Sequence, residues 1–358
     1  MRIQHQFFQA VLAVFLLLPF AADVQAQQQS QQPVVPTLSP ALHTALYPEV
    51  MCAHCIVPQW DAGYIIHREF DKDPSVVTMY DRNGKKVLEG RLEPQGFARV
   101  SPRAAGATKT GGILAVGGGT MTDGSIQGFI AKTDLAGRTV QSVRTGLYSP
   151  HQVCEVTDGT VWTLGYDLNF RDSPDADKNI LHHYSFEKGL LGSFVSIDSI
   201  SKSAGVILHI DSPWKSFLRC SKDRVSVLFW SAGQYIEITA SNGRLVRWTV
   251  AAPVVGEEAT GFGVTEDERI FVSLRGFSEK DNRVTCGLYE LKARPGASVA
   301  TLLGVEGTLT TYDRNSVPPD EAFDRLWGAD GNEIVVHRHG DGWGISWAKV
   351  SPSPSTPD

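Results

Sequence analysis

Several features that would assign this 358-residue chain to a protein class are scarce or missing. It has only five cysteines, and its 33 basic and 39 acidic residues give a formal charge of −6 without any block of one sign. Five cysteines are too few for a scaffold built mainly from disulfides. The lack of a basic patch argues against nucleic acid as a partner. Most of the stability must therefore come from an ordinary apolar core.

Motifs for common chemistries are missing as well. The chain has no GxSxG elbow, HExxH pair, Walker loop or dinucleotide fingerprint. The glycine-rich stretch at 115–124 lies between two expected strands, whereas a phosphate cradle needs a helix to follow. We therefore expect neither a cofactor nor a resident metal ion.

The one long hydrophobic run lies at the N-terminus. Residues 7–22 are apolar, and Val24 and Ala26 occupy the −3 and −1 positions of a signal-peptidase site. This pattern predicts a signal peptide over 1–26. An uncleaved anchor is the alternative, but the run is shorter than the roughly 20 residues of a membrane helix and Pro19 interrupts it. We expect a secreted or periplasmic monomer with no membrane span after cleavage.

Two segments of low complexity bound the expected folded part. Residues 27–40 and 351–358 are rich in Gln, Pro and Ser and hold few side chains that would enter a core. Such composition predicts a disordered tether and a disordered tail. The remainder, 41–350, is expected to be a single domain.

That domain contains repeats of short β-strands. A hairpin with a glycine in its turn occurs five times. The turn glycines are Gly84, Gly137, Gly189, Gly243 and Gly296. An apolar strand that follows a polar turn precedes each hairpin and occurs a sixth time near the C-terminus. Runs such as 113–116 and 225–230 are apolar throughout, as in strands covered on both faces. Three or four strands about every 45 to 60 residues are typical of a β-propeller blade.

We therefore expect an all-β fold, a six-bladed β-propeller. The expected blades are about 57–93, 94–145, 148–200, 203–252, 254–304 and 308–350. The last unit has no return strand before the chain becomes rich in Ser and Pro, and an open sheet edge is a liability. A strand from 41–55 is expected to complete that sheet and close the ring.

The repeats resemble those of NHL-type six-bladed propellers. The stretch "SPHQVCEVTDGTVWTLG" from Ser149 and its echoes "GFGVTEDERIFVSL" and "RLWGADGNEIVV" carry the resemblance, which covers nearly the whole mature chain. It implies a fold with a binding-prone channel mouth and does not imply an activity. Some members bind a metal through channel histidines, and His151 in "PHQV" is similar to such a position. The other units have Phe, Arg or Gly there, whereas a catalytic zinc needs three protein ligands.

In propellers of this type the innermost strand of each blade lines the channel. The candidate ligand-binding residues near the start of these strands are Phe97, Arg99, His151, Phe217, Arg219, Phe262, Arg325 and Trp327. Arginines and aromatic rings at one opening would suit an anionic or ring-bearing small ligand. The alternative is that these side chains pack between blades and fill the channel.

Two hypotheses of function follow. The first is an exported binding or interaction protein whose site, at the channel mouth, takes an unidentified small molecule or protein. The alternative is a hydrolase or lyase that uses His151 and neighbouring arginines at the same mouth. The lack of a recognisable catalytic set favours the first.

The motif "MCAHC" at 51–55 also suggests chemistry. A c-type haem would need histidine directly after Cys55, and a thioredoxin-like pair belongs at the start of a helix. Zinc would need two further ligands, and the three remaining cysteines are expected to be small buried residues: Cys154, Cys220 and Cys286. In an exported protein we expect a Cys52–Cys55 disulfide, with other pairing, free thiols or a redox or metal role as alternatives.

Overall fold

In the computed structural model, β-strands account for nearly all of the regular secondary structure. The structure describes residues 35–47, 59–67, 73–169, 177–204, 216–251, 258–278, 280, 282–313, 325–338 and 343–351. Cys52 and Cys55 lie outside these residues, so their disulfide stays a prediction. Residues 36–351 form one compact unit, which is the unit considered below.

Four sheets of this unit have four strands each. The first contains β2 (Gln59–Asp61), β3 (Tyr64–His67), β4 (Val76–Tyr80) and β5 (Lys86–Arg91). The second contains β6 (Phe97–Ala107), β7 (Ile113–Met121), β8 (Ile126–Thr133) and β9 (Thr139–Gly146). The third contains β10 (Tyr148–Glu155), β11 (Val161–Asp167), β12 (Asn179–Ser185) and β13 (Gly189–Ser196), and α3 (Ile197–Ala204) follows it. The fourth combines β1 (His43–Tyr47) with β23 (Arg325–Asp330), β24 (Glu333–Arg338) and β25 (Trp343–Lys349).

The fifth sheet has nine strands and consists of two antiparallel halves. One half is β14 (Ser216–Ser221), β15 (Arg224–Phe229), β16 (Gln234–Thr239) and β17 (Leu245–Val250), with the 3₁₀ turn η1 (Trp230–Ala232). The other half is β18 (Glu258–Val264), β19 (Ile270–Ser278), β20 (Arg283–Lys292) and β21 (Val299–Gly304), with β22 (Thr310–Asp313) beside β20. The halves join where β17 and β21 pair in parallel over two residue pairs.

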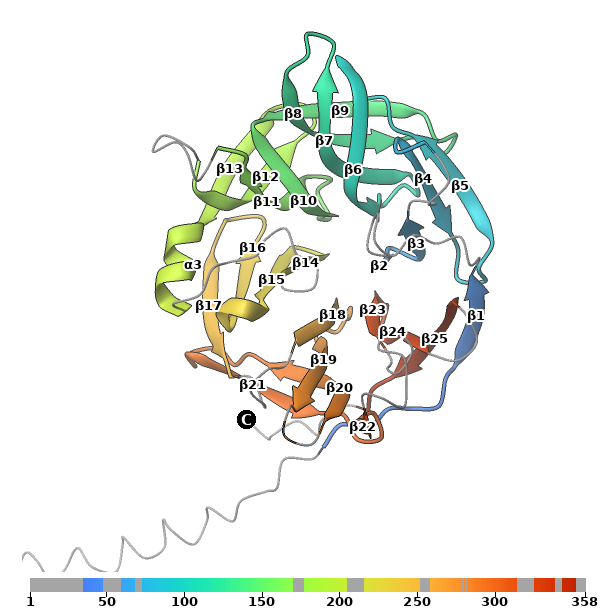
Figure 1. Cartoon of the computed structure of the whole chain (residues 1–358), viewed down its shortest axis with the longest axis vertical. Helices are drawn as coiled ribbons and strands as arrows, with labels where there is room; N and C mark the ends of the chain where they lie inside the picture. The colour runs from blue at the N-terminus through green and yellow to red at the C-terminus, as the bar shows by residue number, and fades with distance from the viewer. Residues whose placement is uncertain are drawn as a thin grey trace, which may run out of the picture. The chain divides into compact units, whose positions relative to one another are not determined.

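The sheets surround a common centre, with β2, β6, β10, β14, β18 and β23 nearest to it (Figure 1). Each of these strands contacts the next one in this order, and β23 contacts β2. Small antiparallel sheets arranged radially in this way make a β-propeller.

Hydrogen bonds also connect the C-terminal ends of successive innermost strands, so these ends lie on one face of the propeller. In chain order, the donors and acceptors are Ala107 N to Asp61 Oδ2, Lys109 N to Glu155 Oε2, Thr157 N to Lys222 O, Lys222 Nζ to Glu266 O, and Glu266 N to Gly331 O. We call this the C-terminal face. The starts of the innermost strands lie toward the opposite face.

The apolar core lies between neighbouring sheets. Trp162 and Leu164 of β11 pack with Val227 and Ile236 of the next sheet, all four fully buried. The next interface packs Phe217 among residues that include Phe262. Both faces of the middle strands are therefore covered, which explains their uninterrupted apolar sequences.

The N-terminal strand β1 supplies the outer strand of the sheet that ends the chain. It pairs antiparallel with β25, with His43 opposite Trp347 and Tyr47 opposite Trp343. Residues 36–40, which belong to the expected tether, lie beside β25 and Glu306. Ser39 N donates to Lys349 O, and Glu306 N donates to Pro36 O. This Pro-rich segment is therefore held by backbone hydrogen bonds, and its Leu38 also packs against a buried apolar cluster.

Candidate functional site

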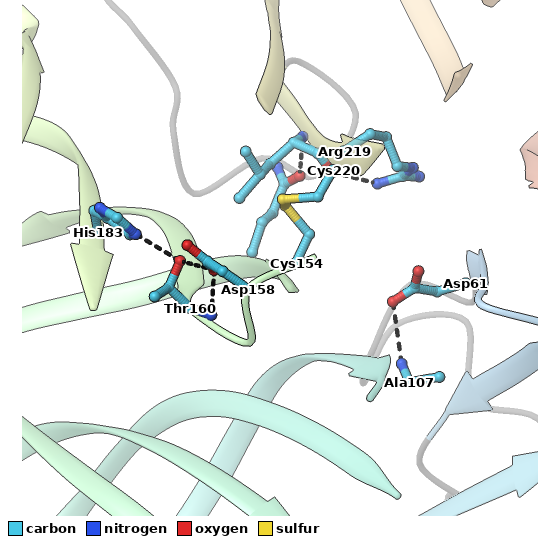
Figure 2. The surroundings of a disulfide bond; sticks show 10 residues. Asp61, Ala107, Cys154, Asp158, Thr160, His183, Arg219 and Cys220 are labelled. Carbon is cyan, nitrogen blue, oxygen red and sulfur yellow. Dashed lines mark hydrogen bonds between the residues drawn. A yellow bond between two sulfur atoms is a disulfide. The ribbon is translucent and has the colours of Figure 1, made fainter. Parts of the chain in front are cut away.

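A disulfide between two innermost strands marks the C-terminal face. Cys154 of β10 and Cys220 of β14 are bonded, 66 residues apart in sequence and 5.5 Å apart between Cα atoms (Figure 2). We expected a small buried residue at each position, and Cys154 is buried, but the two cysteines form a disulfide with each other. Neighbouring innermost strands run side by side, which brings two distant positions to disulfide distance. Cys286 is buried, and its Sγ lies 3.7 Å from the Tyr312 hydroxyl.

Asp61, the last residue of β2, places a carboxyl group near this disulfide. Its Oδ2 accepts the Ala107 N–H at 3.1 Å. A side chain at Gly106 would collide with the same oxygen, so glycine there leaves room for the carboxylate. Burial raises the pKa of Asp61 to about 6, against the smaller opposing effects of Arg219 and of the Ala107 hydrogen bond. A carboxyl group that titrates near neutral pH is typical of functional sites.

Arg219, next to Cys220 in β14, is the basic counterpart. Its Nη1 donates to the Leu218 carbonyl oxygen at 2.8 Å. Its Nε is buried and has no hydrogen-bond acceptor among the residues that the structure describes. Burial lowers the pKa of Arg219 to about 10, with the Asp61 carboxylate acting in the opposite direction. The guanidinium therefore keeps its charge at neutral pH with one donor unused.

Asp61 and Arg219 influence each other without pairing. Among the described residues the two form neither a salt bridge nor a hydrogen bond, although each shifts the pKa of the other. Figure 2 shows Arg219 extending from its strand on the side of the disulfide where Asp61 lies. An anionic group placed between them would accept from Arg219, and also from Asp61 at pH values below about 6, where its carboxyl group is protonated.

A buried ion pair borders this site. Glu155, at the end of β10, accepts the Lys109 N–H at 2.8 Å and lies 3.1 Å from the Lys132 Nζ. Its side chain is 3 % exposed, so the bonds hold it in place. Its negative charge adds to the rise in the Asp61 pKa. The site thus contains one fixed carboxylate and one carboxyl group that titrates near neutral pH.

The aromatic candidates lie in the packing between sheets. Phe217 and Phe262 are buried with ring centroids 6.0 Å apart. Trp327 is buried and stacks on His337 at 5.4 Å. Phe97 is half-buried at the start of β6 and packs against the adjoining core. The structure does not bring these four rings to one opening.

The arginine candidates are separated. Arg99 is exposed near the start of β6, eight residues before Ala107, which in an extended strand corresponds to about 25 Å. Arg325 begins β23, where its backbone pairs with His337, and its side chain lies outside the described part of the chain. Arg219 is thus the candidate arginine that lies near Asp61. Sequence reasoning missed Asp61 because, in "QWDAGY", it resembles any polar residue before a turn.

His151 occupies a β-bulge that recurs in other innermost strands. The residues that these bulges leave out of the pairing are Arg103 in β6, His151 in β10, Thr260 in β18 and Trp327 in β23. His151 is buried, and its ring stacks on Tyr166 at 4.9 Å. A local signal is present in two repeats, where Ser-Pro precedes the bulged residue at 101–103 and 149–151. Bulges often redirect side chains next to sites.

Two adjacent glycines of β7 give a test of how closely β6 approaches β7. A Cβ atom at Gly117 would fall on the Ser101 carbonyl oxygen and lie 2.8 Å from the Pro102 Cα, whereas one at Gly118 would meet only the Gln127 carbonyl oxygen at 3.7 Å. We expect Gly117→Ala to lower the free energy of unfolding by about 1–3 kcal/mol through overpacking. Gly118→Ala should stay within about 0.5 kcal/mol of wild type. Urea denaturation measures both, and equal losses would contradict the close approach of β6 and β7.

The described residues offer neither a cluster of metal ligands nor a membrane-spanning helix. They contain no group of three or more His, Cys, Asp or Glu side chains placed to hold a metal ion. No helix among them is long and apolar enough to cross a membrane.

Comparisons with known proteins reveal similarity at the level of fold. No protein-family profile and no curated protein sequence matches the chain. A structure from Bacteroides fragilis, named as a presumed exported protein, has a TM-score of 0.51 and 9 % identity, covering 91 % of this chain and 98 % of its own. A luciferin-regenerating enzyme has a TM-score of 0.42 and 12 % identity, covering 83 % and 91 %. The WD40 domain of Toxoplasma gondii coronin has a TM-score of 0.38 and 8 % identity, covering 90 % of each chain.

Proposed function

We propose that this chain is an exported six-bladed propeller that binds a small ligand, carrying an anionic group, between Asp61 and Arg219 on the C-terminal face. The observation that carries the proposal is the buried Nε of Arg219, an N–H donor with no acceptor among the described residues, together with the Asp61 carboxyl group, which forms no ion pair with Arg219. Leaving a buried charged donor unsatisfied is costly, so a ligand group that accepts from it would gain a charge-assisted hydrogen bond.

The proposal also includes the number and type of the blades, which we infer to be six blades of the NHL type. The cyclic contacts of six innermost strands support it, and so do the two antiparallel halves of the nine-stranded sheet, which share only two residue pairs. On this interpretation each half is one blade, and β1 closes the ring through its pairing with β25. The domain then spans 41–350 as a monomer.

Export is supported by two independent features. The N-terminal sequence is that of a signal peptide, and Cys154–Cys220 is a bond that persists in oxidising compartments. The Bacteroides fragilis structure with a similar fold is also named as an exported protein. We propose a secreted or periplasmic location.

Calorimetric titration tests the binding proposal. The probes are benzoate, nicotinate and citrate, added to the mature protein and to Arg219→Gln, with Arg247→Gln as control because Arg247 is an exposed arginine of β17. We expect at least one probe to bind, with an affinity about 10-fold or more lower in Arg219→Gln, as for loss of a hydrogen bond to a charged group. Equal affinity in the two arginine variants, or binding of no probe, would contradict the proposal.

Catalysis at the same face is the second candidate function. A carboxyl group with a pKa of about 6 is suited to general acid–base catalysis near neutral pH, and the imidazole of His151 lies in a bulge of β10, the strand that carries Cys154. This is the hydrolase or lyase alternative. Turnover of a lactone, peptide and glycoside panel, abolished in both Asp61→Asn and His151→Ala, would establish it over binding alone.

A further inference from the structure

A large cleft lies at the opposite end of β6 from the Asp61 site. Its volume is about 1560 Å³, and its lining comes from the first half of β6, from β7 and β8, and from residues 73–75 and 91–96. The length of β6 separates it from Ala107, so it is distinct from the site of the proposed function. Phe97 and Arg99, two of the sequence candidates, line this cleft.

Two arginines of the cleft are available for a ligand. Arg99 and Arg103 are exposed, and neither has a hydrogen bond or an ion pair with any described residue. Arg91 also lines the cleft, but its Nη2 lies 3.5 Å from the Asp73 carboxylate. Glu93 is the other acidic side chain of the lining. The cleft thus presents two uncommitted guanidinium groups, which bind carboxylates and sulfates with paired hydrogen bonds.

Part of the floor of the cleft has no side chain, since Gly118 leaves open space there. Gly118 of β7 lies opposite Gly128 of β8, and both line the cleft. β7 and β8 are each paired on both sides, whereas β6, whose first half also lines the cleft, is the edge strand of its sheet. Where these paired strands have no side chain, a ligand can lie directly on the backbone. Its own substituents would then form the hydrogen bonds to the surrounding side chains.

The remaining lining suits a sugar chain. Phe97 offers a half-buried ring beside the arginines, and polar side chains surround the floor. These polar residues are Ser75, Gln95, Ser101, Thr120 and Gln127. The volume exceeds the roughly 300–1,000 Å³ of sites for single drug-sized molecules, so several linked units fit. An acidic peptide would favour a regular strand edge or an apolar groove, and at the cleft the edge of β6 is interrupted by bulges at Ala98 and Arg103 and by Pro102.

From these observations we propose that the cleft binds an anionic oligosaccharide. Its carboxylate or sulfate groups pair with Arg99 and Arg103, a ring lies against Phe97, and the chain crosses the glycine floor at Gly118. This site goes beyond the proposed function and does not depend on it.

Titration of the mature protein with tetragalacturonate tests this proposal. The variants are Arg99→Gln with Arg103→Gln, which remove the two guanidinium groups, and Gly118→Trp, which fills the floor at a position with open space for a side chain. We expect the double arginine variant to bind at least 10-fold more weakly and Gly118→Trp to lose binding. Arg247→Gln, the exposed control, and Arg219→Gln should bind as wild type does, which separates this site from the other.

Three further probes decide the class of ligand. Cellotetraose is neutral, a heparin tetrasaccharide carries sulfates, and tetraglutamate is an acidic peptide. We expect the heparin tetrasaccharide to bind and the other two to bind at least 10-fold more weakly than tetragalacturonate. Tighter binding of tetraglutamate would assign the cleft to peptides, and equal binding of cellotetraose would remove the role of charge. Failure of both anionic sugars to bind, or unchanged affinity in the double arginine variant, would also overturn the proposal.

Discussion

Replacement of both Cys154 and Cys220 by serine is expected to lower the free energy of unfolding by about 4 kcal/mol. The bond closes a loop over a sequence separation of 66 residues, and the chain-entropy model gives about 4 kcal/mol for a loop of this length at 25 °C. The loss is large compared with the roughly 5–15 kcal/mol of a typical domain. Urea denaturation under oxidising conditions measures it.

Reductant provides the control for this prediction. Wild-type protein in reductant should fall to the stability of the double serine variant, and the variant itself should respond only through Cys52 and Cys55. Intact mass before and after reduction then distinguishes one disulfide from two, because reduction of each bond by the reductant adds two hydrogen atoms. A double serine variant within about 1 kcal/mol of oxidised wild type would show that the bond contributes little to folding.

Loss of the bond also bears on the Asp61 site. The bond joins β10 to β14 immediately beside Arg219, whose backbone neighbour Leu218 accepts from it. Gln152 adds a second connection, since its side chain bonds to the backbone of both Ser216 and Leu218. Gln152 bonds should keep the strands adjacent in the serine variant, so we expect weaker ligand binding there and not its complete loss.

The local elements of the fold could be predicted from the sequence because their signals are local. The turn glycines Gly84, Gly137, Gly189, Gly243 and Gly296 all have positive φ, a conformation that glycine adopts without strain. A hairpin needs only the turn and the two strands beside it, all within about 15 residues. The all-β propeller followed from repetition of that signal.

The contents of the site could not be predicted, because they depend on contacts between sheets. Asp61 and Arg219 come from β2 and β14, and neither strand marks its partner in sequence. The same holds for Cys154 and Cys220. The cleft depends on Gly118 lying opposite Gly128, a register that the sequence pattern of the two strands leaves open. The repeats show which sheet a residue belongs to. Its contacts with residues of other sheets depend on how the sheets are placed in space.

Asp61→Asn is expected to stabilise the ligand-free protein at pH 7.5 by up to about 3 kcal/mol. Burial raises the pKa of the carboxyl group from 3.8 to about 6, and each pKa unit corresponds to about 1.4 kcal/mol. Asparagine keeps an oxygen that accepts the Ala107 N–H but has no charge to desolvate. Thermal and urea unfolding of the two proteins at pH 7.5 measure the gain.

The pH dependence gives an independent check. Between pH 3.8 and about 6 the folded protein retains the Asp61 proton that the unfolded chain has released, so wild-type stability falls as pH rises through this window. Asp61→Asn should lack this contribution. Asp123→Asn is the matched control, because hydrogen bonds from Ser125 lower the pKa of this exposed carboxyl group and its effect should have the opposite sign.

A loss of stability in Asp61→Asn at pH 7.5 would mean that the carboxylate serves the fold through its attraction to Arg219. The expected gain has the opposite meaning, since a buried charge that destabilises the folded state is retained for what it binds or reacts with. The same variant should therefore unfold at higher temperature and bind the anionic probes of the Asp61 site at least as tightly at pH 7.5, because the amide removes an ionised carboxylate that repels an anion and its N–H can donate to it. Tetragalacturonate binding at the cleft should be unchanged, which makes Asp61→Asn a test of one site and a control for the other.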